Sequence, residues 1–422
     1  MLGGPFWRLW TASAVSNLAD GVLKVALPLV AIRYTDSPTL IAGLAFALAL
    51  PWLLFALPAG ALADRLDRRR VMIWANVARA LLMAALAVAA VVGASSIWLL
   101  YVVAVLVGIS ETLYDTSSQS ILPLVVPRDR LSRANGRLYA VELAANQFVG
   151  PPLGGVLDSL GIAASFATPA GLWAVAVGAL LLLRGSFRVE RTHRTTLRAD
   201  IGEGLRFLWR NPVLRTLAVM VGVSNFATNA VWAVLVLYAV GPSSAMGLTD
   251  PGFGLLLTAT AAGSLVGSFV AEWTERHLGR ARTLNLSIFT FAAFVGVPAV
   301  TADALIIGGV YFVGGLTIAV WNVITVSLRQ RITPDRLLGR LNSAYRLVAW
   351  GTIPLGAAAG GLLSEWIGLR AMFAVMAVLT LLLVLARFVI TENRLAEAER
   401  DAERAEAEAV TDGVSTTPGV SL

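Results

Sequence analysis

The stretch GALADRLDRRR, residues 60–70, concentrates six charged side chains between two long apolar segments. The apolar segments begin near residues 39 and 71, and similar segments recur along all 422 residues. Of these residues 57% are hydrophobic and 14% are charged, and the mean hydropathy is +0.75. Apolar runs of about 18 or more residues are typical of membrane-spanning helices. Residues 60–70 are therefore predicted to connect two such helices.

The remaining connections predict how the chain crosses the membrane. We expect an all-α protein with twelve spans, which begin near residues 8, 39, 71, 97, 134, 165, 213, 252, 283, 304, 340 and 369. Arginines gather in alternate connections, at 65–70, 128–133, 184–198, 276–282 and 329–336, whereas connections such as VGASSI and GPSSAMGLTDPG contain no Lys or Arg. The positive-inside rule then predicts that both termini are cytoplasmic. The net charge of +7 is a topology signal, not a sign of nucleic-acid binding.

The composition excludes several kinds of chemistry. There is no cysteine, and both histidines, His193 and His277, lie in basic connecting segments, so a membrane-embedded metal cluster or His-based catalytic triad is not expected. The only lysine, Lys24, follows a leucine and cannot belong to a Gly-Lys-Ser/Thr phosphate loop. We expect no enzyme, no cofactor and no ATP hydrolysis. The N-terminal MLGGPFWRLW runs directly into the first span and predicts a retained helix rather than a signal peptide.

The chain also contains an internal repeat. A shift of 207 residues aligns the following pairs: Gly108 with Gly315, Asp115 with Asn322, Pro127 with Pro334, Arg133 with Arg340, Asn135 with Asn342, Gly154 with Gly361, Asp158 with Glu365, and Gly161 with Gly368. Six spans separate the copies, so two pseudo-symmetric six-helix bundles of the same orientation are predicted.

This repeat divides the chain into four parts. We predict an N-terminal bundle at 1–184, a cytoplasmic linker at 185–212, a C-terminal bundle at 213–391, and a charged helix with a disordered tail at 392–422. In the linker, Ile201, Leu205 and Leu208 share one helical face, which is expected to lie along the inner membrane surface. The segment NRLAEAERDAERAEAEAV predicts a solvated helix.

Charged residues inside the predicted spans are the main functional signal. They are Asp20 and Lys24 in span 1, Glu111 and Asp115 in span 4, and Glu142 in span 5. A charge at the centre of a lone membrane helix costs roughly 2.5–3.5 kcal/mol, so these side chains should face the interior of the protein. At 1.5 Å per residue all but Asp115 fall within roughly 6 Å of the midplane. The second half is expected to be uncharged there.

Spacing suggests how these charges interact. Asp20 and Lys24 lie one helical turn apart, so we expect Lys24 to be the counter-ion of Asp20 and also a candidate partner of Glu111. One hypothesis is that protonation of an acid frees Lys24 and biases the protein towards one facing state. The alternative is a fixed ion pair that only holds spans together. Arg79 in span 3 is expected either to reach the cytoplasmic surface or to pair with an acid of the first half.

Polar and aromatic residues of the spans are candidates for lining a substrate cavity. The candidates are Asn17, Tyr114, Asn146, Asn225, Asn229, Trp232, Trp321 and Asn322. Trp52, Phe148, Tyr345 and Trp350 are further aromatic candidates. The alternative for the aromatic side chains is packing or anchoring at the membrane interface.

Two motifs carry a resemblance to a known family. The stretch at 60–70 resembles the loop signature of the major facilitator superfamily, with Gly60, Asp64, Arg65, Arg68 and Arg69 in matching positions and Asp67 in place of a glycine. The resemblance implies a cytoplasmic latch, in which the loop acid meets a helix N-terminus of the other half. The segment TERHLGRAR, with Glu275, Arg276 and Gly279, resembles a degenerate second copy.

The second motif lies in span 5. GPPLGG, with Gly150, Pro151, Gly154 and Gly155, resembles a motif of the drug-antiporter branches, where glycines allow close helix packing and proline kinks the helix. LVVPRDRLSRANG, ITPDRLLGRLNS and GEGLRFLWRNPVLR are similar to the macrolide-efflux and enterobactin-exporter-like branch. A Gly/Pro-rich membrane helix without a special role is the alternative for span 5.

The resemblance implies a secondary transporter of the bacterial cytoplasmic membrane that acts as a monomer. We expect it to export a hydrophobic or amphipathic small molecule, such as a macrolide-like drug or siderophore, by proton antiport and alternating access. A nutrient uniporter or importer of the same fold is one alternative. A transport-inactive sensor or partner protein that acts through the acidic tail is another.

Overall fold

The chain is almost entirely helical in the computed structural model, which describes residues 2–127, 130–185, 187, 197–241, 243–333 and 335–415. Within these ranges the side chains of residues 56–65, 132, 197–201, 335, 336, 339, 343 and 405–415 are not described. Between the helices of the described part, one isolated β-bridge joins Val240 and Leu248. The predicted all-α class is confirmed.

The first half of the molecule contains seven α-helices and one π-helix. They are α1 (Gly4–Ala31), α2 (Pro38–Arg65), α3 (Arg68–Val91), α4 (Ile97–Val125), α5 (Leu131–Leu143), the π-helix η2 (Ala144–Val149), α6 (Gly150–Leu160) and α7 (Ile162–Leu181). Helix α3 packs on α4 and α7, α2 packs on α4, and α1 packs on α6 and α7.

The second half repeats this plan. Its helices are α9 (Pro212–Ala239), α10 (Asp250–Leu278), α11 (Arg280–Val300), α12 (Ala304–Ile332), α13 (Asp335–Ile367), α14 (Leu369–Leu381) and the 3₁₀-helix η3 (Leu382–Phe388). Helix α10 packs on α12, α9 on α13, and α11 on α14. Gly161 and Gly368, which the repeat aligns, both have positive φ (128° and 81°) at the turns into α7 and α14. Both turns need this conformation, which glycine adopts without a steric penalty.

Eleven helices of the described part are long and apolar enough to span a membrane. The remaining predicted span, at 134–160, is made of α5, η2 and α6 in succession. Pro151 and Pro152 cannot donate a backbone hydrogen bond, and the π-helical turns lie directly before them. The predicted interruption of this span is therefore a broadened turn at residues 144–149. The count of twelve spans stays a prediction.

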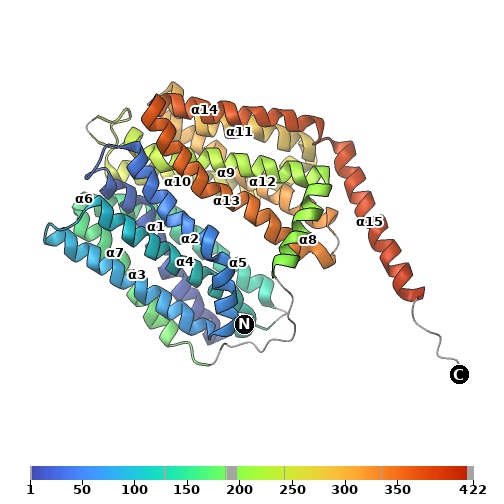
Figure 1. Ribbon diagram of the computed structural model, residues 1–422, viewed down its shortest axis with the longest axis horizontal. Helices are drawn as coiled ribbons and strands as arrows, with labels where there is room; N and C mark the ends of the chain where they lie inside the picture. The colour runs from blue at the N-terminus through green and yellow to red at the C-terminus, as the bar shows by residue number, and fades with distance from the viewer. Residues whose placement is uncertain are drawn as a thin grey trace.

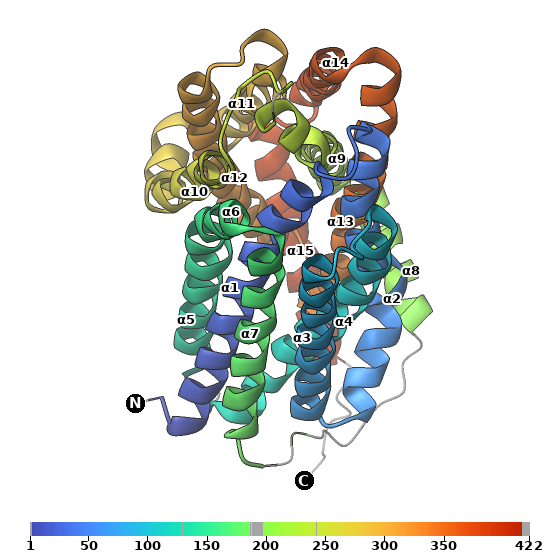
Figure 2. The same ribbon diagram turned by 90° about the vertical axis from the view of Figure 1, so that its left-hand side faces the viewer.

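The two halves meet through two equivalent pairs of helices, α2 with α13 and α6 with α10. Figure 1 shows the second half above the first, and Figure 2 shows α6 against α10 and α2 against α13. We call the end that carries the N-terminus, residues 66–67 and α8 (Leu197–Arg210) the linker end. The far end carries residues 32–37, 92–96 and 240–249.

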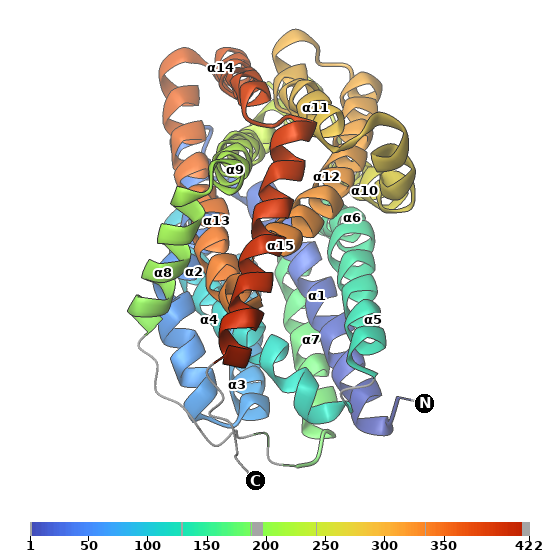
Figure 3. The ribbon, with the colours of Figure 1, turned by 90° about the vertical axis from the view of Figure 1, so that its right-hand side faces the viewer.

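Two helices lie outside the halves. Helix α8 packs on α13, and its Leu208 is fully buried, so this helix contacts protein in addition to any membrane surface. Helix α15 (Glu392–Ser415) starts against the second half and then projects away from it (Figures 1 and 3). Leu395 is fully buried, and Arg280 forms an ion pair with Glu399 at 2.5 Å. The prediction of a solvated helix is thus wrong for its first turns. Residues 416–422 lie outside the described residues.

Candidate functional site

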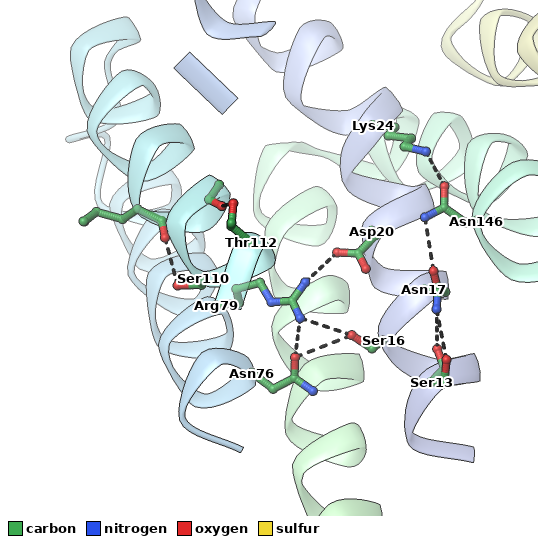
Figure 4. Close-up of polar contacts among 12 residues, drawn as sticks. Ser13, Ser16, Asn17, Asp20, Lys24, Asn76, Arg79, Ser110, Thr112 and Asn146 are labelled. Carbon is green, nitrogen blue, oxygen red and sulfur yellow. Dashed lines mark hydrogen bonds and ion pairs between the residues drawn. The ribbon is translucent and has the colours of Figure 1, made fainter. Parts of the chain in front are cut away.

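Among the charged side chains described in the first half, that of Arg79 in α3 is the most deeply buried, because it is fully inaccessible. Its Nη1 donates to Asp20 Oδ1 of α1 at 2.9 Å, and its Nη2 donates to Asn76 Oδ1 at 2.5 Å (Figure 4). The guanidinium lies between the rings of Tyr114 and Trp173, 4.8 and 4.9 Å from their centroids. A buried charge must be paired and hydrogen-bonded to be stable, and Arg79 has both an acid and cation–π partners. This network joins α1, α3, α4 and α7.

Ser16 completes the network on α1. Arg79 Nη2 donates to Ser16 Oγ at 3.4 Å, and Ser16 Oγ donates to Asn76 Oδ1 at 3.5 Å. Asp20 is 14% exposed, so it forms the boundary between the buried arginine and the accessible space beside α1. Asn76 and Ser16 are site residues that the sequence interpretation missed, because polar neutral side chains inside a span carry no periodic signal.

The expected ion pair between Asp20 and Lys24 is wrong. The Lys24 Nζ atom donates to Asn146 Oδ1 of η2, and Asp20 pairs with Arg79 instead (Figure 4). The alternative given for Arg79, that it pairs with an acid of the first half, is confirmed. Helical spacing identifies neighbours only within one helix, whereas the competing guanidinium comes from a different helix. Lys24 is an exposed cation beside a polar strip of α1 and η2.

That polar strip contains two of the predicted cavity residues. Asn146 Nδ2 donates to Asn17 Oδ1 at 3.5 Å, and Asn17 Nδ2 donates to Ser13 O at 2.9 Å. Because Asn146 lies in the π-helix, its side chain is displaced from the position that a regular helix would give it. Asn17, Asn146 and Lys24 therefore form one connected polar surface.

The three other acids predicted inside the spans of the first half have no strong partner among the described residues. Within the described part of the chain, Glu111, Asp115 and Glu142 form no hydrogen bond or ion pair with another side chain. Glu111 and Asp115 are partly buried on consecutive turns of α4, and Glu142 is exposed at the end of α5. Glu111 lies close enough to Asp20, Arg79 and Lys24 for their charges to act on it. No group of three or more acids or histidines among the described residues is arranged to hold a metal ion.

The second half uses amide side chains for packing. Asn225 Nδ2 of α9 donates to Ala349 O of α13 at 2.7 Å, and Asn229 Nδ2 donates to Asn225 O at 2.8 Å. Asn322 is exposed on α12. Asn225 therefore fastens α9 to α13 and has a structural role.

Several aromatic candidates also pack. Trp321 is 4% exposed and meets Phe291 edge-on, with ring centroids 5.6 Å apart. Tyr114 is 3% exposed beneath Arg79. Trp232 contacts the rings of Phe294 and Tyr311 at 6.0 and 5.6 Å. For Tyr114 and Trp321 the predicted cavity role is wrong in this conformation, and the packing alternative holds, because both side chains are enclosed by neighbouring helices.

The expectation of an uncharged second half is wrong at one position. Arg346 of α13 lies over the ring of Trp350 at 4.3 Å and over that of Trp52 at 5.5 Å. Trp52 of α2 and Trp350 meet edge-on at 4.8 Å, so this cluster bridges the halves. Arg346 is also close enough to Asp115 for their charges to interact. Arg346 lies six residues after Arg340, close to the basic connection at 329–336.

The gating-loop residues divide into two groups. Gly60, Asp64 and Arg65 belong to the end of α2, and their side chains lie outside the described residues, so the predicted latch stays a prediction. Arg68 is buried, and Arg69 donates to the carbonyls of Leu180 and Leu181 at 2.8 and 2.9 Å.

Asp67 stands where the family has glycine, and its side chain has a clear role. Its carboxylate accepts from the backbone N–H of Arg70 at 3.1 Å and of Phe187 at 2.9 Å. It therefore caps the N-terminus of α3, a position at which aspartate is favoured. The turn is stabilised by this cap.

The span-5 motif packs on two sides. A Cβ atom at Gly150 would lie 2.5 Å from the Gly21 Cα atom, and one at Gly154 would lie 2.7 Å from Val22 O, so α6 touches the backbone of α1. A Cβ atom at Gly155 would lie 2.2 Å from Asp250 O of the other half. Pro151 O similarly approaches Gly254 of α10. Glycines in this motif allow one short helix to touch both α1 and α10.

Two halves of the same plan, joined by equivalent helix pairs and carrying buried charges between apolar spans, define a membrane transporter of the major facilitator type. The chain belongs to the transmembrane secretion effector family, whose family model matches residues 3–418.

Similarity to known transporters in sequence and in structure supports this family assignment. The multidrug efflux pump Tap of Mycolicibacterium fortuitum is 29% identical over 398 residues, which cover 90% of this chain and 94% of Tap. Macrolide efflux protein A of Streptococcus pyogenes is 21% identical over 403 residues, covering 92% of this chain and 96% of that protein. The solved structure of the nucleoside transporter NupG matches with a TM-score of 0.72 at 12% identity, over 92% of this chain and all of NupG. The predicted resemblance to efflux proteins of this superfamily is confirmed.

Proposed function

We propose that this protein exports a hydrophobic or amphipathic small molecule across the cytoplasmic membrane in exchange for protons. Its similarity to proteins named as multidrug and macrolide efflux pumps supports the export of a drug-like substrate. The separation of its buried charges into a paired group and an unpaired group carries the proposal of proton coupling.

The paired group is Asp20 with Arg79. Arg79 is fully buried and bound on several sides, so its guanidinium is held beside Asp20 as a counter-charge. The unpaired group is Glu111, Asp115 and Glu142. Glu111 is partly buried within reach of the charges of both Arg79 and Lys24, so its protonation changes the net charge next to the polar strip. We assign the coupling proton to Glu111, with Asp115 one turn away as its relay.

Alternating access follows from the contact between the halves. The arginine-rich connections support a cytoplasmic position of the linker end, and the far end is then the outer end. Helices α6 and α10 touch at this outer end through Gly155 and Asp250. The conformation is therefore closed to the outside. Export requires the halves to rock until this contact opens and the cytoplasmic side closes.

The test uses purified protein in liposomes that contain a macrolide and a trapped pH-sensitive dye. The outer solution is made acidic, and proton entry is recorded with and without the macrolide inside. Proton entry that depends on the macrolide supports antiport. Macrolide release without proton entry would instead support the uniporter alternative, and would contradict the assignment of a coupling proton to Glu111.

The matched variants are Glu111→Gln and Glu272→Gln. Glu111→Gln should remove macrolide-dependent proton entry while the protein stays folded, because no described side chain forms a hydrogen bond or ion pair with Glu111. Glu272 forms an exposed pair with Arg276 on α10, so Glu272→Gln changes one acid to its amide without touching the proposed site. Coupled transport that survives Glu111→Gln would contradict the assignment of the proton to this residue.

A further inference from the structure

The far end of the molecule is held shut by two polar contacts between the halves. In the first, Arg33, which follows α1, pairs with Asp158 of α6 and also donates to the Asp158 backbone carbonyl at 3.0 Å. The same Arg33 Nη2 atom lies 3.8 Å from Asp250 Oδ2, at the first residue of α10. Asp158 is 1% exposed and also accepts from Ser165 Oγ at 2.9 Å. Arg33 therefore connects an acid of the first half to an acid of the second.

The second contact lies where α13 meets the start of α2. Glu365 Oε2 accepts from Ser37 Oγ at 2.8 Å and from the Thr39 backbone N–H at 3.4 Å. Thr39 Oγ1 in turn donates to Gly361 O at 3.4 Å. A carboxylate beside the free N–H groups of a helix N-terminus is favourable, because those groups carry partial positive charge.

The repeat relates these two contacts. Asp158 and Glu365 are aligned by the shift of 207 residues, and each lies near the far end of equivalent helices, α6 and α13. Each acid faces the first turn of a helix from the other half, α10 or α2. Among the described residues, the hydrogen bonds and ion pairs that join the two halves are these contacts at the far end.

One difference between the two contacts explains the presence of Arg33. Helix α2 begins with Pro38 and is preceded by Ser37, so Glu365 meets donors directly. Helix α10 begins with Asp250, so Asp158 would meet another carboxylate. Like charges across an interface are strongly unfavourable. The positive charge of Arg33 lies beside both acids and turns their mutual repulsion into a net attraction.

We propose that Arg33, Asp158, Asp250 and Glu365 form the outer gate of the transport cycle, with Arg33 as the residue that turns an acid–acid repulsion into a latch. The gate rests on the proposed function for its role in export. Its existence is tested without substrate or proton gradient, so failure of the proposed function would leave the measurement meaningful. Asp36 lies in the same connecting segment as Arg33, and the other charged groups of the contact are Asp158 and Asp250.

The absence of cysteine makes the gate directly measurable, because introduced cysteines are the only sites for spin labels. The distance between labels at the exposed residues Ala94 and Ala245 measures the separation of the halves at the far end. The distance between labels at the exposed residues Leu66 and Gln330 measures it at the linker end. Each pair is changed to cysteine, labelled, and measured by double electron–electron resonance in lipid nanodiscs. The unaltered gate should give a short far-end distance.

Arg33→Ala should lengthen the far-end distance and shorten the linker-end distance, with roughly a tenfold rise in the ratio of open to closed molecules. Glu365→Gln should cause a smaller rise of about twofold, because its carboxylate is exposed. Arg276→Ala, which breaks an exposed ion pair inside one half, should change neither distance. An unchanged far-end distance in Arg33→Ala would overturn the proposal.

The decisive variant is Arg33→Ala combined with Asp250→Asn. The second change removes the repulsion that Arg33 normally neutralises, so the far-end distance should return towards the closed value. A merely structural role of Arg33 predicts no such rescue, and a double variant as open as Arg33→Ala overturns the latch. If Arg33→Ala broadens the distances at both ends, Arg33→Gln repeats the test with more of the side chain retained. A closed far end in Arg33→Gln equally overturns it.

Discussion

The two halves of this transporter share one backbone plan but differ in the chemistry of their interiors. The first half holds Arg79 and Asp20 in a buried network and places Glu111 and Asp115 beside it. At the related depth the second half has Asn225, which is bonded to the backbone, and the packed rings of Trp232 and Trp321. Asp115 itself is aligned with the neutral Asn322.

This difference shows that the two halves share helix packing but not the charged side chains inside their spans. A buried ion pair is stable only when every partner is present, so a charge is retained only where a function or a complete network keeps it. The positive Arg346 is the exception in the second half, and it faces the first half through Trp52. The first half therefore contains the titratable side chains inside the spans, whereas the side chains at the related positions of the second half are mostly neutral.

The largest expected effect is on the charged network of the first half. Asp20→Asn leaves the fully buried Arg79 without its counter-charge, which should destabilise the protein by about 3–5 kcal/mol. Thermal unfolding of the detergent-solubilised protein measures the loss. The double variant Asp20→Asn/Arg79→Gln should recover much of it, and equal losses in the single and double variants would show that the pair is not coupled.

A second prediction separates two glycines that the repeat aligns. A Cβ atom at Gly154 would approach Val22 O within the first half, whereas one at Gly361 would lie 2.6 Å from the Ala42 Cβ atom across the halves. Gly154→Ala should therefore lower thermal stability by about 1–3 kcal/mol. Gly361→Ala should instead lengthen the far-end distance between labels at Ala94 and Ala245.

The control for both changes is Gly171→Ala in α7, where an added Cβ atom has no neighbour within 4 Å. This variant should change neither stability nor distance to a comparable extent. If Gly154→Ala and Gly361→Ala behave alike, the aligned positions have the same role, and the proposed difference between the halves fails at this point.

A smaller loss of stability is expected from a change to the neutral polar side chains of the second half. Asn225→Ala removes the hydrogen bond to Ala349 O and should cost about 1 kcal/mol. Thermal unfolding compares this loss with that of Asp20→Asn. Losses of similar size would mean that the two halves depend equally on their buried polar groups.

The smallest effect is expected at the C-terminal helix. Deletion of residues 405–422 keeps the buried Leu395 and the pair of Glu399 with Arg280, so macrolide-dependent transport should be unchanged. A loss of transport would favour the alternative in which the tail acts on a partner. Glu399→Gln is the comparison, since it breaks the docking of α15 while the tail remains.

Sequence periodicity predicted the helical class and the approximate positions of the spans, because both depend on apolar runs of sufficient length. Matching residues at a shift of 207 predicted the internal repeat. The positive φ of Gly161 and Gly368 agrees with that repeat. The candidate site was predicted less well. Asp20, Lys24, Asn17 and Asn146 do share one region, but the partner of Asp20 was misassigned, and Tyr114 and Trp321 are buried rather than lining a cavity.

The sequence by itself determined the apolar helical segments, the internal repeat and which residue types lie inside those segments. Those properties follow from hydropathy, charge distribution and repeat spacing, which are read along one dimension. Only the tertiary structure decided that Arg79 of α3 pairs with Asp20 of α1 and that Arg33 lies between Asp158 and Asp250. Pairing between distant helices depends on their rotation and packing, and no spacing along the chain encodes either of them.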